Sequence, residues 1–111
     1  MTVISTDTQL VTFINVFNVE PANQKRLVEL LVRVTDAFVR RAPGFVSSSL
    51  HRSIDGTKVT MYAQWRTIDD YEAMRGDPNP QRYLEQALAI SQFEPGRYEV
   101  VASFVPPREA G

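Results

Sequence analysis

Asn15 is the residue whose surroundings most favour a chemical role. Side chains alternate between the two faces of an extended strand, which places Val11, Phe13, Asn15 and Phe17 on one side. Burying a carboxamide without partners is unfavourable. Asn15 therefore either hydrogen-bonds to backbone groups, as an ordinary strand residue does, or serves a ligand. In the second case Phe13 and Phe17 are expected to bind the same ligand.

A second candidate group lies near the end of another extended run. Met61, Ala63 and Trp65 share one strand face, and the small Ala63 between two large side chains leaves room for a flat ligand. Tyr71 follows shortly after and can point its phenol into the same space. The structural alternatives are a Trp65 that packs in the core with its N–H on a carbonyl, and a Tyr71 that is only half-buried.

Metal and thiol chemistry lack suitable residues. The chain has no cysteine and one histidine, His51, with no second histidine at a ligand spacing. We therefore expect no metal site, no disulfide and no cysteine nucleophile. His51 is expected at a strand rim, on the surface or hydrogen-bonded.

The first half of the chain predicts a strand, a helix and a hairpin. The run 9–19 is rich in β-branched and aromatic residues and predicts a strand covered on both faces. Pro21 suits a first helical turn, and apolar residues then recur at helical spacing to residue 41, where two arginines favour the C-terminal end of the helix dipole. The extended runs 45–54 and 58–65 flank Asp55-Gly56, a pair suited to a tight hairpin turn.

The second half predicts an interrupted helix and a last strand. Thr67 and Asp70 resemble a capping box, so a short helix should begin after Thr67 and break at 76–80. A further helix is expected over 80–92 and a last strand over 97–105. Residues 106–111 have little apolar surface and are expected to form a flexible tail.

This element order predicts the fold class. At 111 residues, 43% of them hydrophobic, the chain 1–111 fits one domain. Strand, helix, strand, strand, helix, strand is the α+β ferredoxin-like βαββαβ order, with an antiparallel sheet and helices on one face. Because most aromatic residues lie on predicted strands, we expect the second face to be apolar and covered by a second copy, giving a dimeric α/β-barrel. A monomer with a polar outer face is the alternative.

Charge and hydropathy exclude two kinds of partner. The net charge is −1, and no Lys/Arg-rich run could neutralise a phosphate backbone, so nucleic acid is not an expected partner. No apolar run approaches the ~20 residues that span a bilayer, and the N-terminus lacks the pattern of a secretion signal. We expect no membrane partner and a cytoplasmic protein.

Four segments resemble the antibiotic biosynthesis monooxygenase family, especially its actinobacterial anthrone and polyketide oxygenases. The first strand reads Val-Thr-Phe-Ile-Asn-Val-Phe from Val11, and Pro-Gly-Phe-Val follows the first helix. Asp-Gly-Thr occupies the hairpin, and Tyr-Ala-Gln-Trp ends at Trp65. The resemblance covers nearly the whole chain and implies a homodimeric ferredoxin-like fold.

The resemblance also implies an activity and its residues. Such oxygenases add oxygen from O2 to a reduced aromatic polyketide, such as an anthrone or hydroquinone, in antibiotic biosynthesis without metal or flavin. Their working groups match Asn15, Trp65 and Tyr71 here, while Met61 stands where the family carries a second Asn. The substrate supplies the electrons, so no cofactor is expected, and the partners are the aromatic small molecule and O2.

Three alternatives remain open. Some relatives modify polyketide rings with reduced flavin, which here would arrive as a diffusible co-substrate because no nucleotide-binding Gly-rich loop is present. Haem-degrading relatives use a helix histidine, and this chain has none after His51. A non-catalytic dimeric protein that binds small molecules in the pathway is the third, and Met61 is its best support.

Overall fold

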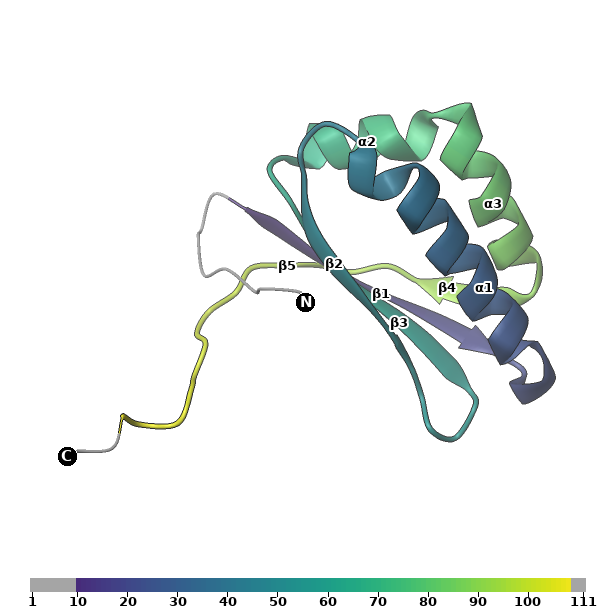
Figure 1. Cartoon of the computed structure of the whole chain (residues 1–111), viewed down its shortest axis with the longest axis horizontal. Helices are drawn as coiled ribbons and strands as arrows, with labels where there is room; N and C mark the ends of the chain where they lie inside the picture. Colours follow the sequence, from purple (N-terminus) through teal and green to yellow (C-terminus); the bar gives the residue numbers. More distant parts are fainter. Residues whose placement is uncertain (1–9, 109–111) are drawn as a thin grey trace.

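The computed structural model describes residues 10–108 and has the predicted α+β ferredoxin-like order (Figure 1). The strands pair antiparallel in the order β2-β3-β1-β4, with β5 also on β1, and the helices cover one face. The strands are β1 (Val11–Val19), β2 (Phe45–Arg52), β3 (Lys58–Trp65), β4 (Ser91–Glu94) and β5 (Arg97–Tyr98). The helices are α1 (Pro21–Ala37), the 3₁₀ turn η1 (Val39–Arg41), α2 (Ile68–Gly76) and α3 (Pro78–Ala89).

Strand β1 lies in the middle of the sheet and shows the predicted alternation. Phe13, Asn15 and Phe17 are buried beneath the helices. Ile14 and Val16 point to the opposite face and are only half-buried. Within one chain the helices cover only one face of β1, so the predicted cover on its second face stays a prediction.

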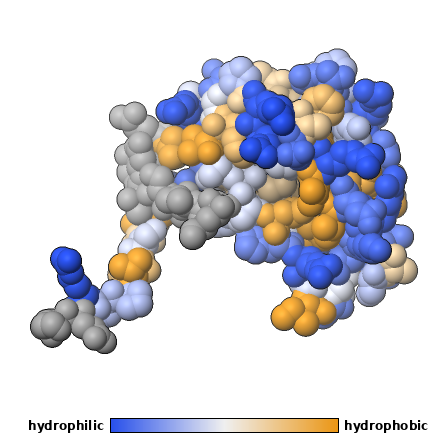
Figure 2. Space-filling model, viewed as in Figure 1, coloured by the Kyte–Doolittle hydropathy of each residue, from blue (hydrophilic) through white to orange (hydrophobic). Residues whose placement is uncertain are grey.

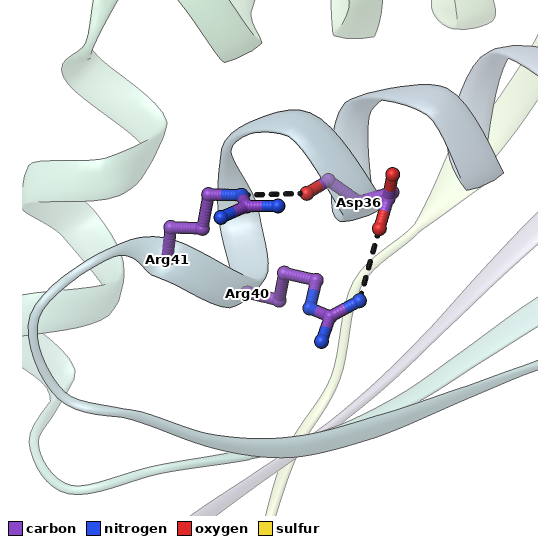
Figure 3. A network of polar contacts seen from close by, with 3 residues as sticks. All are labelled: Asp36, Arg40 and Arg41. Carbon is purple, nitrogen blue, oxygen red and sulfur yellow. Dashed lines mark hydrogen bonds and ion pairs between the residues drawn. The ribbon is translucent and has the colours of Figure 1, made fainter.

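Helix α1 begins at Pro21 as predicted, but it ends at Ala37 and the chain continues as the 3₁₀ turn η1. The two arginines of η1 contact Asp36 near the end of α1, as Figure 3 shows. Arg41 Nε donates to the Asp36 carbonyl oxygen at 3.1 Å, and Arg40 pairs with the Asp36 carboxylate at 2.9 Å. The cations therefore lie at the end of the helix where its carbonyls lack partners.

The hairpin of β2 and β3 forms as predicted, but its turn is longer than two residues. Only Gly56 has a positive φ, +84°, whereas a tight turn on Asp55-Gly56 would need positive φ at both residues. The loop closes with Ser53 N donating to Lys58 O at 2.9 Å. Hydrogen bonds from Thr57 and Ser53 to the Asp55 carboxylate lower its pKa to about 2 and order this loop.

The second helical segment is a corner made of two capped helices. The Thr67 hydroxyl accepts from Asp70 N at 3.0 Å, which confirms the predicted start of α2. Asp77 ends α2, and its carboxylate accepts from Asn79 N at 3.0 Å to begin α3. The predicted helix over 80–92 is displaced: α3 spans Pro78–Ala89, because Pro78 fits a first helical position.

The predicted last strand over 97–105 begins at Arg97 as expected but ends at Tyr98. The main edge pairing is made by β4, which lies opposite Val16–Val19, and β5 pairs only with Thr12 and Phe13. Since β1 begins at Val11, the chain beyond Tyr98 soon has no partner in the sheet. Residues 99–108 therefore form an arm without regular structure. Figure 1 shows this arm leaving the body, and Figure 2 shows hydrophobic residues along it. Its Val101, Phe104 and Val105 are 90%, 91% and 86% exposed.

The uncovered face of the sheet is less apolar than expected. Its large apolar side chains are Ile14, Val16 and Tyr62, which are half-buried, and Tyr98, which is exposed; the other positions are mostly polar. Gln64 and Thr12 on this face are buried and joined by a hydrogen bond of 3.2 Å. The predicted aromatic outer face is therefore confirmed only in part: Tyr62 and Tyr98 lie on it, while the other strand aromatics pack beneath the helices.

Gly44 holds β2 close to α2. Its φ is +86°, and a Cβ at this position would lie 2.2 Å from the Asp70 carboxylate, so only glycine fits. Its carbonyl accepts from Arg66 N at 2.8 Å, which fixes the chain just beyond Trp65.

Within residues 10–108, no helix combines the length and apolar character that a membrane span requires.

Candidate functional site

The predicted site residues meet on the helix-covered face of the sheet. The pairing of β1 with β3 sets Phe13 opposite Ala63 and Asn15 opposite Met61. Trp65 follows Ala63 on the same face and is 1% exposed. Tyr71 reaches this group from α2 and contacts Phe13 and Trp65. Strand register and the Thr67 cap together therefore bring the two predicted groups into one place.

A small cavity of about 60 Å³ lies between this face and the helices. Of the predicted residues, Phe13 does not line it: its ring stacks against Tyr71 with centroids 3.9 Å apart and supports the phenol from behind. The site residues that do line the cavity are Asn15, Phe17, Met61, Ala63, Trp65 and Tyr71, and several apolar side chains complete its wall, among them Leu31, Val34, Met74 and Phe93.

Asn15 is held in one orientation by the backbone. Gly96 N donates to Asn15 Oδ1 at 3.3 Å, and Asn15 Nδ2 donates to Tyr71 Oη at 3.4 Å. Because a backbone N–H can only donate, the carboxamide oxygen must face Gly96 and the NH₂ group must face the cavity side. Asn15 thus has the backbone partner of the structural interpretation, and it keeps one N–H for another acceptor, so its role toward a ligand stays a proposal.

Arg75 is the site residue that the sequence analysis missed. Its Nη1 donates to Tyr71 Oη at 3.0 Å, and its guanidinium lies 5.4 Å from the Phe93 ring centroid. Tyr71 Oη therefore accepts from both Asn15 and Arg75, which leaves its own proton for a third group. The signal was the four-residue spacing of Tyr71 and Arg75, which puts both on one face of α2.

Trp65 is held by aromatic contacts on two sides. Its ring meets Tyr71 edge-to-face at 5.7 Å and Phe45 at 5.4 Å between centroids. Such contacts fix the plane of the indole at the cavity wall, as the core interpretation of Trp65 requires. The ring also lines the cavity, so the ligand interpretation stays a proposal.

The remaining candidates lie away from the cavity. His51 is exposed on β2 and its ring hydrogen-bonds to the Ser49 hydroxyl at 2.9 Å, as expected for a rim histidine. The part of the chain that the structure describes holds no group of three His, Cys, Asp or Glu side chains able to bind a metal ion.

The chemistry that this arrangement supports is stabilisation of negative charge in an apolar space. Asn15, Tyr71 and Arg75 form one polar cluster, while the rest of the cavity is mainly apolar. Donors in such a place stabilise an oxyanion more strongly than they would in water. At about 60 Å³ the cavity is far smaller than the roughly 300–1,000 Å³ of typical ligand sites, so a larger ligand needs further space.

The sequence matches the family described as antibiotic biosynthesis monooxygenase over residues 10–86. The curated tetracenomycin-F1 monooxygenase of Streptomyces glaucescens is 42% identical over 104 residues, which cover 94% of this chain and 93% of that protein.

Two solved structures share the fold at appreciable sequence identity. SnoaB, described as a cofactor-independent oxygenase from Streptomyces nogalater, superposes with a TM-score of 0.71 and 28% identity, covering 88% of this chain and 98% of its own. ActVA-Orf6 of Streptomyces coelicolor, a monooxygenase solved with nanaomycin D, gives 0.77 and 29%, covering 91% and 96%. The expectation of a cofactor-free oxygenase agrees with the description of SnoaB.

Proposed function

Because the chain belongs to the antibiotic biosynthesis monooxygenase family, we propose that it oxygenates an aromatic polyketide with O2 and without metal or bound flavin. The observation that carries the proposal is the donor cluster of Asn15, Tyr71 and Arg75 beside an apolar cavity. The likeness to polyketide oxygenases supports the substrate class: a reduced ring of the anthrone or hydroquinone kind.

The reaction needs no outside reductant. An anthrone loses two hydrogen atoms and gains one oxygen atom to become a quinone, and the second atom of O2 leaves as water. The deprotonated substrate passes one electron to O2, the substrate radical and superoxide combine to a peroxide, and the peroxide loses water. The protein's part is to stabilise the anions and to exclude water from the cavity.

Three residues of this chain have roles in the proposal. The free N–H of Asn15 and the indole N–H of Trp65 donate to the substrate oxyanion. The phenol proton of Tyr71, left over after its oxygen accepts two hydrogen bonds, goes to the peroxide or orients a substrate hydroxyl. Neither Asn15 nor Trp65 is a base, so in this proposal the acidic substrate gives its proton to solvent.

Arg75 supports this site where Met61 does not. Met61 lies directly opposite Asn15 and offers no N–H donor, although the resembling oxygenases carry an Asn there. Arg75 brings a positive charge into contact with Tyr71 Oη at 3.0 Å. In our proposal the Tyr71–Arg75 pair supplies the polarity that a second carboxamide would otherwise provide.

Oxygen uptake with anthrone as the probe tests the function. The purified protein should consume O2 and form anthraquinone, at a rate unchanged by dialysis against a strong chelator and by added reduced flavin. Uptake that needs reduced flavin would favour the flavin-dependent ring-modifying oxygenase. Binding of anthrone without uptake would favour a non-catalytic binding protein and contradict the proposal.

A homodimer is the assembly that we infer. Support comes from Ile14, Val16 and Tyr62 on the uncovered face and from the arm, whose Val101 and Phe104 contact little of their own chain. A second copy would remove these apolar groups from water. Light scattering at micromolar concentration should give about twice 12.6 kDa, and Phe104→Asp should shift the mass toward one chain. A monomer in the unsubstituted protein contradicts the inference.

A further inference from the structure

Thr35 has a buried hydroxyl that nothing in the proposed reaction uses. It lies near the end of α1, and its Oγ1 is inaccessible to solvent and has no hydrogen-bond partner in the part of the chain that the structure describes. Helical threonines commonly bond back to a carbonyl of the preceding turn, and the Thr35 hydroxyl does not. Buried polar groups are rarely left unpaired unless a ligand or water completes them.

This hydroxyl lies at the boundary between two hollows. The inner one is the cavity of about 60 Å³ beside Asn15, Trp65 and Tyr71. The outer one is a groove of about 480 Å³ between α1 and β2, lined by residues such as Asp36, Arg40 and Leu50. Thr35, Ser48 and Met61 line both hollows and so form the wall between them.

The inner cavity is too small to hold a whole polycyclic ligand, so such a ligand needs a second compartment. Sites for ligands of this class measure roughly 300–1,000 Å³, several times the inner volume. The outer groove supplies that volume, and the wall between the two hollows contains Met61, whose unbranched side chain adapts its shape more readily than a branched one. The groove also carries polar side chains, which suit a ring that bears oxygen substituents.

We propose that the outer groove receives the part of the polyketide remote from the reacting ring, and that a shift of Met61 joins the two hollows and opens the Thr35 hydroxyl to an oxygen substituent of the ligand, to which it then hydrogen-bonds. The inference rests on the proposed function for the identity of the ligand. Thr35 is then a positioning residue: it selects hydroxylated polycyclic substrates and sets how far the reacting ring enters the inner cavity. The hydroxyl can donate or accept, so both phenol and quinone oxygens fit it.

Ligand binding tests this without turnover. Trp65 is the chain's only tryptophan and lines the inner cavity, so quenching of its fluorescence reports occupancy. The probes are a dihydroxyanthraquinone and unsubstituted anthraquinone. Thr35→Val, which removes the hydroxyl and keeps the shape, should weaken binding of the dihydroxy compound roughly three- to tenfold and leave the unsubstituted one unchanged. Thr35→Ser, which keeps a hydroxyl, should restore the stronger binding of the dihydroxy compound.

Two controls separate this proposal from the proposed function. Thr60→Val changes a threonine on the opposite sheet face and should alter neither affinity. With a dihydroxyanthrone as oxygenation substrate, Thr35→Val should raise KM by a similar factor and change kcat less than twofold. Equal quenching curves for Thr35→Val and the parent would overturn the role of Thr35, whatever the activity. Discrimination by Thr35 in a protein that does not oxygenate would uphold it and contradict the oxygenase function alone.

Discussion

Replacing Asn15 by alanine should lower the turnover of an anthrone by roughly ten- to a thousandfold while the protein stays folded. The substitution removes the N–H that faces the cavity and also the acceptor for Gly96 N at 3.3 Å. Donors aimed at a developing oxyanion in an apolar space account for effects of this size. Steady-state oxygen uptake measures turnover, and far-ultraviolet circular dichroism checks the fold.

Three variants show which part of Asn15 matters. Asn15→Asp keeps an oxygen for Gly96 N–H but replaces the donor by an acceptor, so it should lose at least as much turnover as the alanine variant. Asn18→Ala changes the same residue type on the opposite face of β1 and should stay within about twofold of the parent. Met61→Asn adds a donor directly across from Asn15 and should raise turnover. An Asn15→Ala enzyme with parental turnover would make Asn15 a purely structural residue.

The second large effect is expected for Tyr71→Phe. This variant keeps the ring stacked on Phe13 at 3.9 Å and removes only the hydroxyl that accepts from Asn15 and Arg75. If the phenol proton reaches the substrate or the peroxide, kcat should fall roughly ten- to a hundredfold with a smaller change in KM. Single-turnover kinetics with anthrone should place the loss in the chemical step.

Comparison with Arg75 and Tyr83 makes this test specific. Arg75→Met removes the donor to Tyr71 Oη and keeps an unbranched side chain, so it should reproduce part of the Tyr71→Phe loss. In the double variant the two losses should not add, because both residues act through one hydroxyl. Tyr83→Phe changes a tyrosine that packs on Phe38 and should leave kcat unchanged. Full activity in Tyr71→Phe would restrict Tyr71 to packing.

Trp65 needs a gentler change because it is 1% exposed and packs on two rings. Trp65→Phe keeps an aromatic ring and removes the N–H. If turnover falls while the urea midpoint is unchanged, the loss comes from the missing N–H donor. If the urea midpoint falls together with turnover, Trp65 acts as a core residue.

Local chemistry made most of the fold predictable. The alternation along β1 and the cap at Thr67 depend on neighbouring residues only, and both are confirmed. The last strand was predicted too long for a non-local reason. Its length depends on where its partner β1 begins, at Val11, and the sequence over 97–105 carries no information about that position. The prediction for the outer face of the sheet was limited for a similar reason, because the burial of the aromatic side chains depends on which face the helices cover.

The site was predictable where it lies on strands, but of its helix residues the sequence pointed only to Tyr71. Period-two alternation with the pairing of β1 and β3 brings Asn15 and Met61 together, and the sequence pattern pointed to both. Arg75 and Thr35 look like ordinary helix residues, because charged and hydroxyl side chains usually face solvent. Only the packing of the helices on the sheet shows that Arg75 contacts Tyr71 and that the Thr35 hydroxyl is buried.

Proteolysis of the arm of residues 99–108 can report whether two copies of the chain associate. Phe104 is 91% exposed in a segment without regular structure, whereas Phe13 and Phe17 lie in a paired central strand. A protease that cleaves after aromatic residues needs an extended, accessible backbone, so the first cut in a single chain falls at Phe104. If a second copy covers the arm, that cut slows as protein concentration rises, and the rate of digestion itself measures the dissociation constant of the pair.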